Sequence, residues 1–211
     1  MNNSGLLITT EGIDGSGKTS LAISLEKSLK EKNIDVILTK EPGSTELGSK
    51  IREILHSTEF KTCPKAEYLL FASDRAQNFE KVIKPALKEN KVIISDRSGY
   101  SSLAYQGYGR NISTEMIKNI NSWATDNIPY DLIFYIKIDI QTAIERFLKR
   151  GHKLTSFEIE NQKFWEKVST GFEEIFKDMN NVVILDGKKS IEELTEISTS
   201  KVIELWKHQQ H

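Results

Sequence analysis

The sequence predicts an α/β fold in which a five-stranded parallel sheet is flanked by helices on both faces. Short apolar runs rich in β-branched residues alternate with longer helical patterns along the chain, as in proteins built from βαβ units. A glycine-rich motif, GIDGSGKT, separates the first apolar run from the first helical pattern, which is typical of a phosphate-binding loop. A chain of 211 residues is long enough for a substantial core, and we expect residues 1–211 to form one domain.

The elements are expected in strict alternation. After the motif, Leu21, Leu25 and Leu29 recur every four residues, which indicates a helix with one apolar face. The five apolar runs predict strands at 6–10, 34–40, 91–97, 131–139 and 181–187. Longer helical patterns lie at 44–57, 65–89, 113–127, 140–150, 158–178 and 189–207. Polar clusters follow four of the strands, and a parallel sheet brings such clusters together at one edge, where ligands bind.

Composition narrows the class of protein. The formal net charge is −1, so general basic character does not point to nucleic acid as a partner. The chain has one cysteine, Cys63, which excludes an intramolecular disulfide framework and fits a reducing compartment. The first residues lack a basic segment, and no apolar run approaches a membrane span in length. We therefore expect a soluble, cytoplasmic protein that does not bind membranes.

The motif itself predicts contacts with a nucleoside triphosphate and Mg²⁺. Backbone amides of such a loop hold phosphates, Lys18 is expected to reach the β- and γ-phosphates, and Thr19 to offer its hydroxyl to Mg²⁺. The residues assigned to this site are Gly12, Ile13, Asp14, Gly15, Ser16, Gly17, Lys18 and Thr19. Asp14 leaves two interpretations open: a solvated carboxylate pointing outward, or a contact with a substrate sugar or a metal-bound water.

Asp96 and Arg97 end the strand at 91–97. An acid at this place is where phosphate-loop enzymes hold a second Mg²⁺-associated carboxylate, usually through a water molecule. Arg97 offers a planar fork suited to phosphate. The alternative is that Asp96 and Arg97 form an ion pair that closes the edge of the sheet.

Further candidates lie on the helical patterns. Phe71 and Arg75 are four residues apart and share a helix face, where they are able to stack on a base and bond its edge. Taken alone, Phe71 suits the core and Arg75 a solvated surface. Arg146 and Arg150 precede the polar segment GHKLTSFE, a candidate flap over the phosphates at about 150–158. With Arg52, these arginines suggest two anionic ligands, and the chain has no N-K-x-D motif of the kind that reads guanine in GTPases.

Three longer motifs resemble the thymidylate kinase family, whose members phosphorylate dTMP with ATP. They are EPG at 41–43, LLFASDRAQ at 69–77 and DRSGYSSLAYQG at 96–107, and with the phosphate loop they occur in the family's order. The resemblance implies the phosphate-loop nucleoside monophosphate kinase fold with a short lid at about 150–158. It also implies ATP and Mg²⁺ as cofactors, nucleotides as the only ligands, a role in dTTP synthesis and a homodimer.

The same resemblance implies roles for individual residues. Lys18, Asp14, Arg97 and Arg150 would be catalytic, Arg146 would join the phosphate loop at ATP, and Thr19 with Asp96 would hold the metal. Arg52 and Arg97 would hold the dTMP phosphate near Glu41, and Phe71 and Arg75 would read thymine. The residues implied to contact dTMP are Glu41, Arg52, Phe71, Arg75, Arg97, Ser101, Ser102, Tyr105 and Gln106.

The chain departs from the family pattern at the catalytic arginine. Some members carry an arginine in the phosphate loop, where this chain has Gly15, and others carry it in the flap, where this chain has Ser156. Arg150, or else Lys153, is expected to supply the missing charge. Three alternatives stay open: another acceptor such as dUMP or a deoxynucleoside, a catalytically weak nucleotide-binding protein, and a nucleic-acid-binding ATPase.

Overall fold

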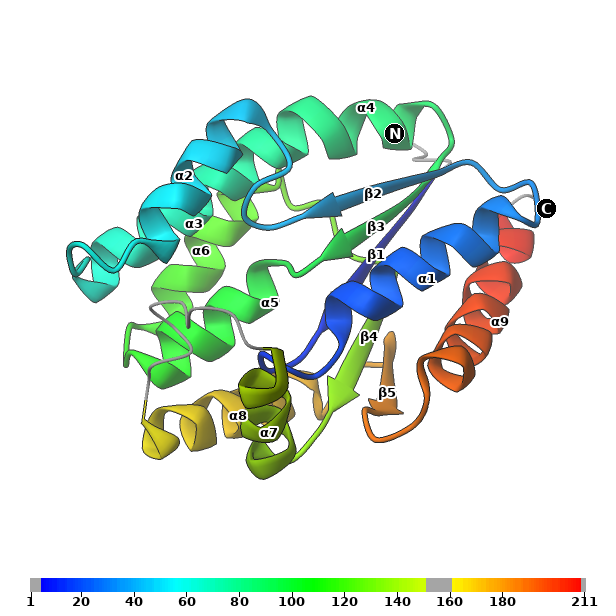
Figure 1. The fold of residues 1–211 in the computed structure, drawn as a ribbon. Helices are drawn as coiled ribbons and strands as arrows, with labels where there is room; N and C mark the ends of the chain where they lie inside the picture. Colours follow the sequence, from blue (N-terminus) through cyan, green and yellow to red (C-terminus); the bar gives the residue numbers. More distant parts are fainter. Residues whose placement is uncertain (1–4, 151–160, 210–211) are drawn as a thin grey trace.

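The computed structural model describes residues 5–150 and 161–209, apart from the side chains of residues 147, 148 and 150. Its sheet contains β1 (Leu6–Glu11), β2 (Val36–Lys40), β3 (Val92–Asp96), β4 (Leu132–Lys137) and β5 (Val182–Asp186). The strand order is β2-β3-β1-β4-β5 and all pairs are parallel. The predicted five-stranded parallel sheet is therefore confirmed, and β1 lies at its centre with every residue buried (Figure 1).

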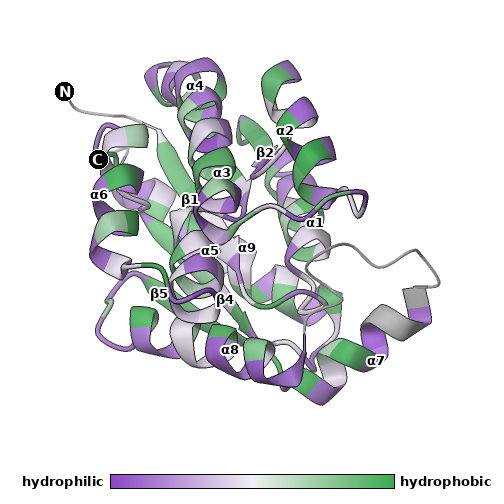
Figure 2. Cartoon of the chain, turned by 90° about the vertical axis from the view of Figure 1, so that its left-hand side faces the viewer, coloured by the Kyte–Doolittle hydropathy of each residue, from purple (hydrophilic) through white to green (hydrophobic). Residues whose placement is uncertain are grey.

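Alternate residues of the central strands build two cores, because successive side chains of a strand point to opposite faces. Leu6 and Ile8 pack with the leucine stripe of α1 (Lys18–Lys30) and with α9 (Ile191–Gln209). Leu7 faces the other layer, which the remaining helices cover (Figure 1). Figure 2 shows apolar colour concentrated on the strands and polar colour on the outer helix faces.

All but one of the other helices follow the predicted patterns, with bounds that differ by a few residues. The other helices are α2 (Glu46–His56), α3 (Pro64–Asn78), α4 (Lys84–Lys88), α5 (Gly99–Ser102), α6 (Thr114–Ala124), α7 (Ile140–Arg150) and α8 (Gln162–Phe176). The single helix expected at 65–89 contains a π-helical segment, η1 (Phe79–Ile83), between α3 and α4. The beginning of the pattern predicted at 158–178 lies outside the described residues.

One helical segment was not predicted. Residues 99–109 form α5 followed by the π-helical segment η2 (Leu103–Gly109), although serine and glycine there favour a loop. Tertiary packing overrides that preference: the Tyr105 ring makes edge contacts with Phe164, Trp165 and Phe172 of α8. The segment therefore brings the side chains of Ser101, Ser102, Tyr105 and Gln106 to the carboxyl end of β3.

The carboxyl ends of β1, β2 and β3 meet at one edge of the sheet. Asp96 is in register with Thr10 of β1 and with Lys40 of β2. The polar residues that follow these strands are thereby close together in space, as the sequence predicts. Among the described residues, no helix has the length and apolar character needed to cross a membrane.

Candidate active site

The glycine motif forms a loop between β1 and α1 whose backbone needs glycine. Gly12 has a φ of 143°, and a Cβ atom there would lie 2.5 Å from the carbonyl oxygen of Ile136. Gly17, which caps α1, has a φ of 104°. Residues with a side chain rarely adopt these φ angles. Glycine at both positions therefore allows the loop to turn its backbone N–H groups towards an anion at the start of α1.

Lys18 lies inside the curve of this loop. Its side chain is buried, and Nζ donates a hydrogen bond to the carbonyl oxygen of Ile13 at 2.8 Å. The Asp14 carboxylate is 3.8 Å from the same ammonium group. Arg146 supports the loop from α7, because its guanidinium donates to the carbonyl oxygens of Gly15, Ser16 and Gly187.

Thr19 and Asp96 form a pair of oxygen ligands suited to Mg²⁺. Thr19 Oγ1 donates to Asp96 Oδ2 at 2.6 Å, and the other carboxylate oxygen, Oδ1, is buried without a hydrogen-bond partner. A hydroxyl and a carboxylate are the hard oxygen donors that Mg²⁺ prefers. No cluster of three or more acidic, histidine or cysteine ligands occurs in the described part of the chain. The ion would therefore take most of its ligands from phosphate oxygens and water, as is usual for this metal.

A pocket of about 430 Å³ lies above these residues. It is lined by fifteen of the predicted site residues: Asp14, Gly15, Gly17, Lys18, Thr19, Glu41, Arg52, Phe71, Arg75, Asp96, Arg97, Ser101, Ser102, Tyr105 and Gln106. Gly12, Ile13, Ser16 and Arg146 do not line it. Five further lining residues were assigned no site role: Ser20, Lys40, Pro42, His56 and Ser98.

Arg97 and Asp14 both line the pocket and face each other. An Arg97 Nη2 to Asp14 Oδ1 ion pair joins β3 to the phosphate loop. Arg97 Nη1 donates to Ser101 Oγ at 3.0 Å, and its guanidinium carbon lies 5.2 Å from the centre of the Tyr105 ring. The interpretation of Asp14 as an outward, solvated carboxylate is therefore wrong, because it is drawn inward by two cations.

The alternative ion pair between Asp96 and Arg97 is also wrong. Asp96 is engaged by Thr19, as described above, while the Arg97 guanidinium turns towards Asp14. Arg97 has a φ of 78°, a left-handed conformation that is uncommon for residues other than glycine. Its N–H donates to the carbonyl oxygen of Thr10 at 3.2 Å, which holds that conformation in place.

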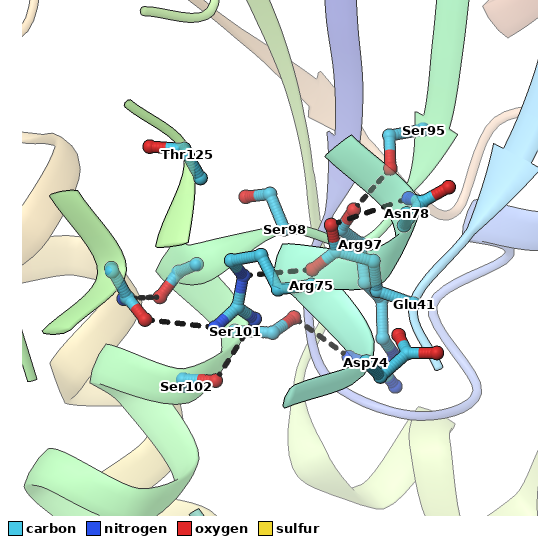
Figure 3. A network of polar contacts seen from close by, with 12 residues as sticks. Glu41, Asp74, Arg75, Asn78, Ser95, Arg97, Ser98, Ser101, Ser102 and Thr125 are labelled. Atoms are coloured by element: carbon cyan, nitrogen blue, oxygen red, sulfur yellow. Dashed lines mark hydrogen bonds and ion pairs between the residues drawn. The ribbon is translucent and has the colours of Figure 1, made fainter. Parts of the chain in front are cut away.

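Arg75 is buried rather than solvated, with 1 % of its side chain exposed. Nε donates to Glu41 Oε2 at 2.8 Å, Nη1 to Asn121 Oδ1 at 2.8 Å and Nη2 to Ser102 Oγ at 3.1 Å (Figure 3). The interpretation of Arg75 as a solvated surface charge is wrong. Its three partners come from distant segments of the chain, and the sequence alone did not indicate them. Burial raises the pKa of Glu41 to about 7, with the Arg75 guanidinium acting in the opposite direction.

The remaining predicted residues lie around this core. Phe71 packs against the edge of the larger hydrophobic core and also lines the pocket. Arg52 Nη1 donates to the carbonyl oxygen of Pro42 at 3.0 Å. Gln106 Nε2 donates to Glu67 Oε1 at 2.9 Å, which fixes the amide from the neighbouring helix.

Sequence reasoning missed several polar residues that support the site. Glu11, Glu67, Asp74 and Asn121 each accept hydrogen bonds from residues 31 to 90 positions away in the chain. Burial raises the pKa of Asp74 to about 6, although the Gly43 N–H donates to its carboxylate. Glu11 directly precedes the glycine motif in the sequence, but only the fold shows that Ser98 and Ser101 donate to it.

The sequence model of the thymidylate kinase family matches residues 10–197. The chain belongs to the thymidylate kinase family. It is 44% identical to the thymidylate kinase of Fervidobacterium nodosum over 189 residues, covering 90% of this chain and 94% of that protein. It is 44% identical to that of Thermosipho africanus over 187 residues, covering 89% and 92%. It is 41% identical to that of Acholeplasma laidlawii over 203 residues, covering 94% and 98%.

Thymidylate kinases are ATP-dependent enzymes that use Mg²⁺ and convert dTMP to dTDP, and this is the activity of the family to which the chain belongs. Membership sets aside a different acceptor and a nucleic-acid-binding ATPase. The catalytically weak nucleotide-binding protein rested on the missing arginine, and the assay proposed below tests it. Arg150 ends α7, and its side chain lies outside the described residues. Lys153, Ser156 and the lid predicted at about 150–158 also lie outside them, except for the backbone of residue 150.

Proposed function

We propose that this thymidylate kinase binds both nucleotides in the pocket above the sheet and transfers the γ-phosphoryl group of ATP directly to dTMP. The observation that supports this proposal is the shared lining of one pocket by the phosphate loop and by the arginine and aromatic residues of α2, α3 and η2. Two anionic ligands with facing phosphates need cations between them. Lys18, Arg52 and Arg97 supply such cations along the pocket.

On the donor side, the amides of residues 12–19 and the Lys18 ammonium hold the ATP phosphates. Arg146 does not line the pocket but supports the loop through two contacts with its backbone carbonyls, while a third contact ties the same guanidinium to Gly187 after β5. Thr19 and Asp96 would hold Mg²⁺, which would neutralise charge on the donor phosphates. The assignment of Mg²⁺ to Thr19 and Asp96 rests on their oxygen donors and on the buried, unpaired Oδ1 of Asp96.

On the acceptor side, Arg52 and Arg97 bind the dTMP phosphate, and Phe71 stacks on thymine. Arg75 donates to the edge of the base with the N–H groups that Glu41, Asn121 and Ser102 do not use. An arginine only donates, so it favours a pyrimidine with an acceptor oxygen at C4 over one with an amino group there. Ser101, Ser102 and Gln106 line the nucleoside part, and the Tyr105 ring lies beneath the sugar.

The reaction needs alignment and charge more than a protein base. A phosphate oxygen of dTMP, ionised near neutral pH, attacks the γ-phosphorus while the bond to the β–γ bridging oxygen breaks, giving dTDP and ADP. Lys18 and Arg97 stabilise negative charge on the transferred group, and Asp14 keeps Arg97 directed into the pocket until the acceptor arrives. Tyr105 fixes the loop, because its hydroxyl accepts a hydrogen bond from the Asp14 N–H at 3.0 Å.

The experiment that tests this function is a coupled ADP-release assay with ATP and Mg²⁺. We expect rapid release with dTMP and little with dCMP, dGMP or thymidine; dUMP measures how much the thymine methyl group contributes. Release that is equally fast with dCMP would contradict the role of Arg75. Tight binding of both nucleotides with no ADP release would contradict catalytic competence.

For Arg150, we expect Arg150→Ala to lower kcat more than it raises KM for either nucleotide. A cation that contacts the transferred group only in the transition state contributes to kcat, and such an arginine is worth about 10³–10⁵ in rate. Steady-state kinetics with dTMP and ATP measure both parameters, and Lys149→Ala, next to it in α7, is the control. An unchanged kcat would direct attention to Lys153 instead.

We also propose that the chain works as a homodimer in the cytoplasm, as a single kinase domain with a lid at about 150–158. Support for the dimer comes from exposed apolar side chains on the neighbouring helices α3 and α6: Leu69, Met116 and Trp123, of which Trp123 is 78 % exposed. A soluble monomer rarely exposes such a group together. Sedimentation equilibrium would contradict the dimer if it gave a mass near 24.1 kDa at micromolar concentration.

A further inference from the structure

Glu11, the last residue of β1, is a buried carboxylate that does not line the pocket. It is 0 % exposed, and both of its oxygens accept short hydrogen bonds. Ser98 Oγ donates to Oε1 at 2.6 Å, and Ser101 Oγ donates to Oε2 at 2.6 Å. A carboxylate without a proton can only accept, so both serine hydroxyl groups must direct their hydrogens at Glu11.

This arrangement fixes what Ser101 offers to the pocket. Because the only hydroxyl hydrogen of Ser101 is committed to Glu11, its oxygen is left as an acceptor, and Arg97 Nη1 donates to it at 3.0 Å. Figure 3 shows Ser101 and Arg97 in the same network, with Ser98 beside them. The buried carboxylate is thus linked to the Arg97 guanidinium through one hydroxyl group.

The second half of the Arg97 guanidinium is held by a different group. Nη2 pairs with Asp14, and a phosphate that binds Arg97 would have to share or replace that contact. Nη1 with Ser101, and the Tyr105 ring at 5.2 Å, would remain in place during such an exchange. The anchor on Nη1 therefore decides whether the guanidinium keeps its orientation when phosphate arrives.

We propose that Glu11 is a positioning residue for the acceptor phosphate, acting through Ser101 to hold Arg97 in its binding orientation. This rests on the proposed function, in which Arg97 binds the phosphate of dTMP. The role differs from that of Glu41, which pairs directly with Arg75 on the base side of the pocket. Two buried carboxylates thus hold two arginines, one for each end of the acceptor.

If Glu11 only supported the fold, its replacement would lower thermal stability and would not single out the binding of phosphate. Burial raises the pKa of Glu11, which means that the ionised group is costly to keep inside the protein. The hydrogen-bond partners of Glu11 are two neutral hydroxyl groups, so Glu11→Gln leaves neither partner as an uncompensated buried charge, which is what makes a broken ion pair costly. We therefore expect Glu11→Gln to keep the thermal stability of the wild type, and any loss of binding to have another cause.

The test is isothermal titration of Glu11→Gln with dTMP and with thymidine, which lacks the phosphate. Glutamine has one accepting oxygen instead of two and carries no charge, so it cannot hold both serine hydroxyl groups, and the support that Glu11 gives to Arg97 through Ser101 is weakened. We expect dTMP affinity to fall about tenfold or more, as for a lost hydrogen bond to a charged group, with thymidine affinity unchanged. Glu41→Gln is the matched control, because it should weaken both ligands alike.

Two further variants sharpen the result. Ser101→Ala removes the link, so combining it with Glu11→Gln should give no greater loss than Ser101→Ala alone. Glu11→Asp keeps the charge but withdraws the carboxylate by one methylene group, and should give an intermediate preference for dTMP over thymidine. It also serves as the test should Glu11→Gln fail to fold.

The outcomes separate this proposal from the proposed function. A Glu11→Gln variant with the wild-type preference for dTMP over thymidine would overturn the role of Glu11 alone. So would equal losses for both ligands, or losses that add to those of Ser101→Ala. A wild-type chain that binds thymidine as tightly as dTMP would instead contradict the binding of phosphate by Arg97, and both proposals would fail together.

Discussion

Lys18→Ala is expected to abolish nearly all turnover while dTMP continues to bind. The ammonium group lies at the phosphate loop, buried and held by the Ile13 carbonyl oxygen at 2.8 Å. In the transition state it would face charge developing between the β- and γ-phosphates. Removing a group that acts at that point costs about 10³-fold or more in kcat, as for other preorganised charge contacts.

The measurements are single-turnover kinetics for the chemical step and calorimetric titration for dTMP. Lys27→Ala is the control, because Lys27 lies on the same helix with 79 % of its side chain exposed. A second variant, Lys18→Arg, keeps the charge but not the compact ammonium shape, and we expect it to remain far below the wild-type rate. Turnover within tenfold of the wild type in Lys18→Ala would remove Lys18 from this role.

The local part of the site was predictable from the sequence, because its chemistry is carried by neighbours in the chain. Gly12, Lys18 and Thr19 lie within one short motif, and its strand and helix context is equally local. Helical spacing placed Phe71 and Arg75 on one face, the family resemblance implied their role in the site, and both line the pocket. Periodicity likewise predicted the five strands, since each is a distinct apolar run.

The long-range partners were not predictable in the same way. Ser101 donates to Glu11 across 90 positions, and Arg75 to Asn121 across 46, so a single sequence contains no sign of either pair. Because these distant partners are not visible in the sequence, Arg75 was also compatible with a solvated surface. The helical segment 99–109 was missed because its stability comes from aromatic packing against α8 rather than from its own residues.

Arg75→Met is expected to destabilise the chain and to remove selectivity for thymine. The guanidinium and the Glu41 carboxylate are both almost fully buried, at 1 % and 2 % exposed, and lie 2.8 Å apart. Removing one partner of such a pair leaves the other charge uncompensated, which costs about 3–5 kcal/mol of unfolding free energy. Asn121 and Ser102 also lose the donor that they accept from.

The loss of unfolding free energy in Arg75→Met should depend on pH, and the direction of this dependence follows from the pKa of Glu41. Burial already raises its pKa to about 7, and without Arg75 the pKa rises further. A carboxyl group with a raised pKa in the folded state contributes stability that is fully present below its unfolded pKa and is lost as pH rises through the folded value. Arg75→Met should therefore be more stable at pH 5 than at pH 8, measured by urea unfolding.

The double variant Glu41→Gln with Arg75→Met separates stability from recognition. It removes the uncompensated charge, so much of the lost unfolding free energy and its pH dependence should return, because replacing both partners of a buried pair is often nearly neutral. Discrimination between dTMP and dCMP should stay lost, since the donor to the pyrimidine edge is still missing. A double variant that regained both stability and discrimination would show that Arg75 only supports the fold and does not read the base.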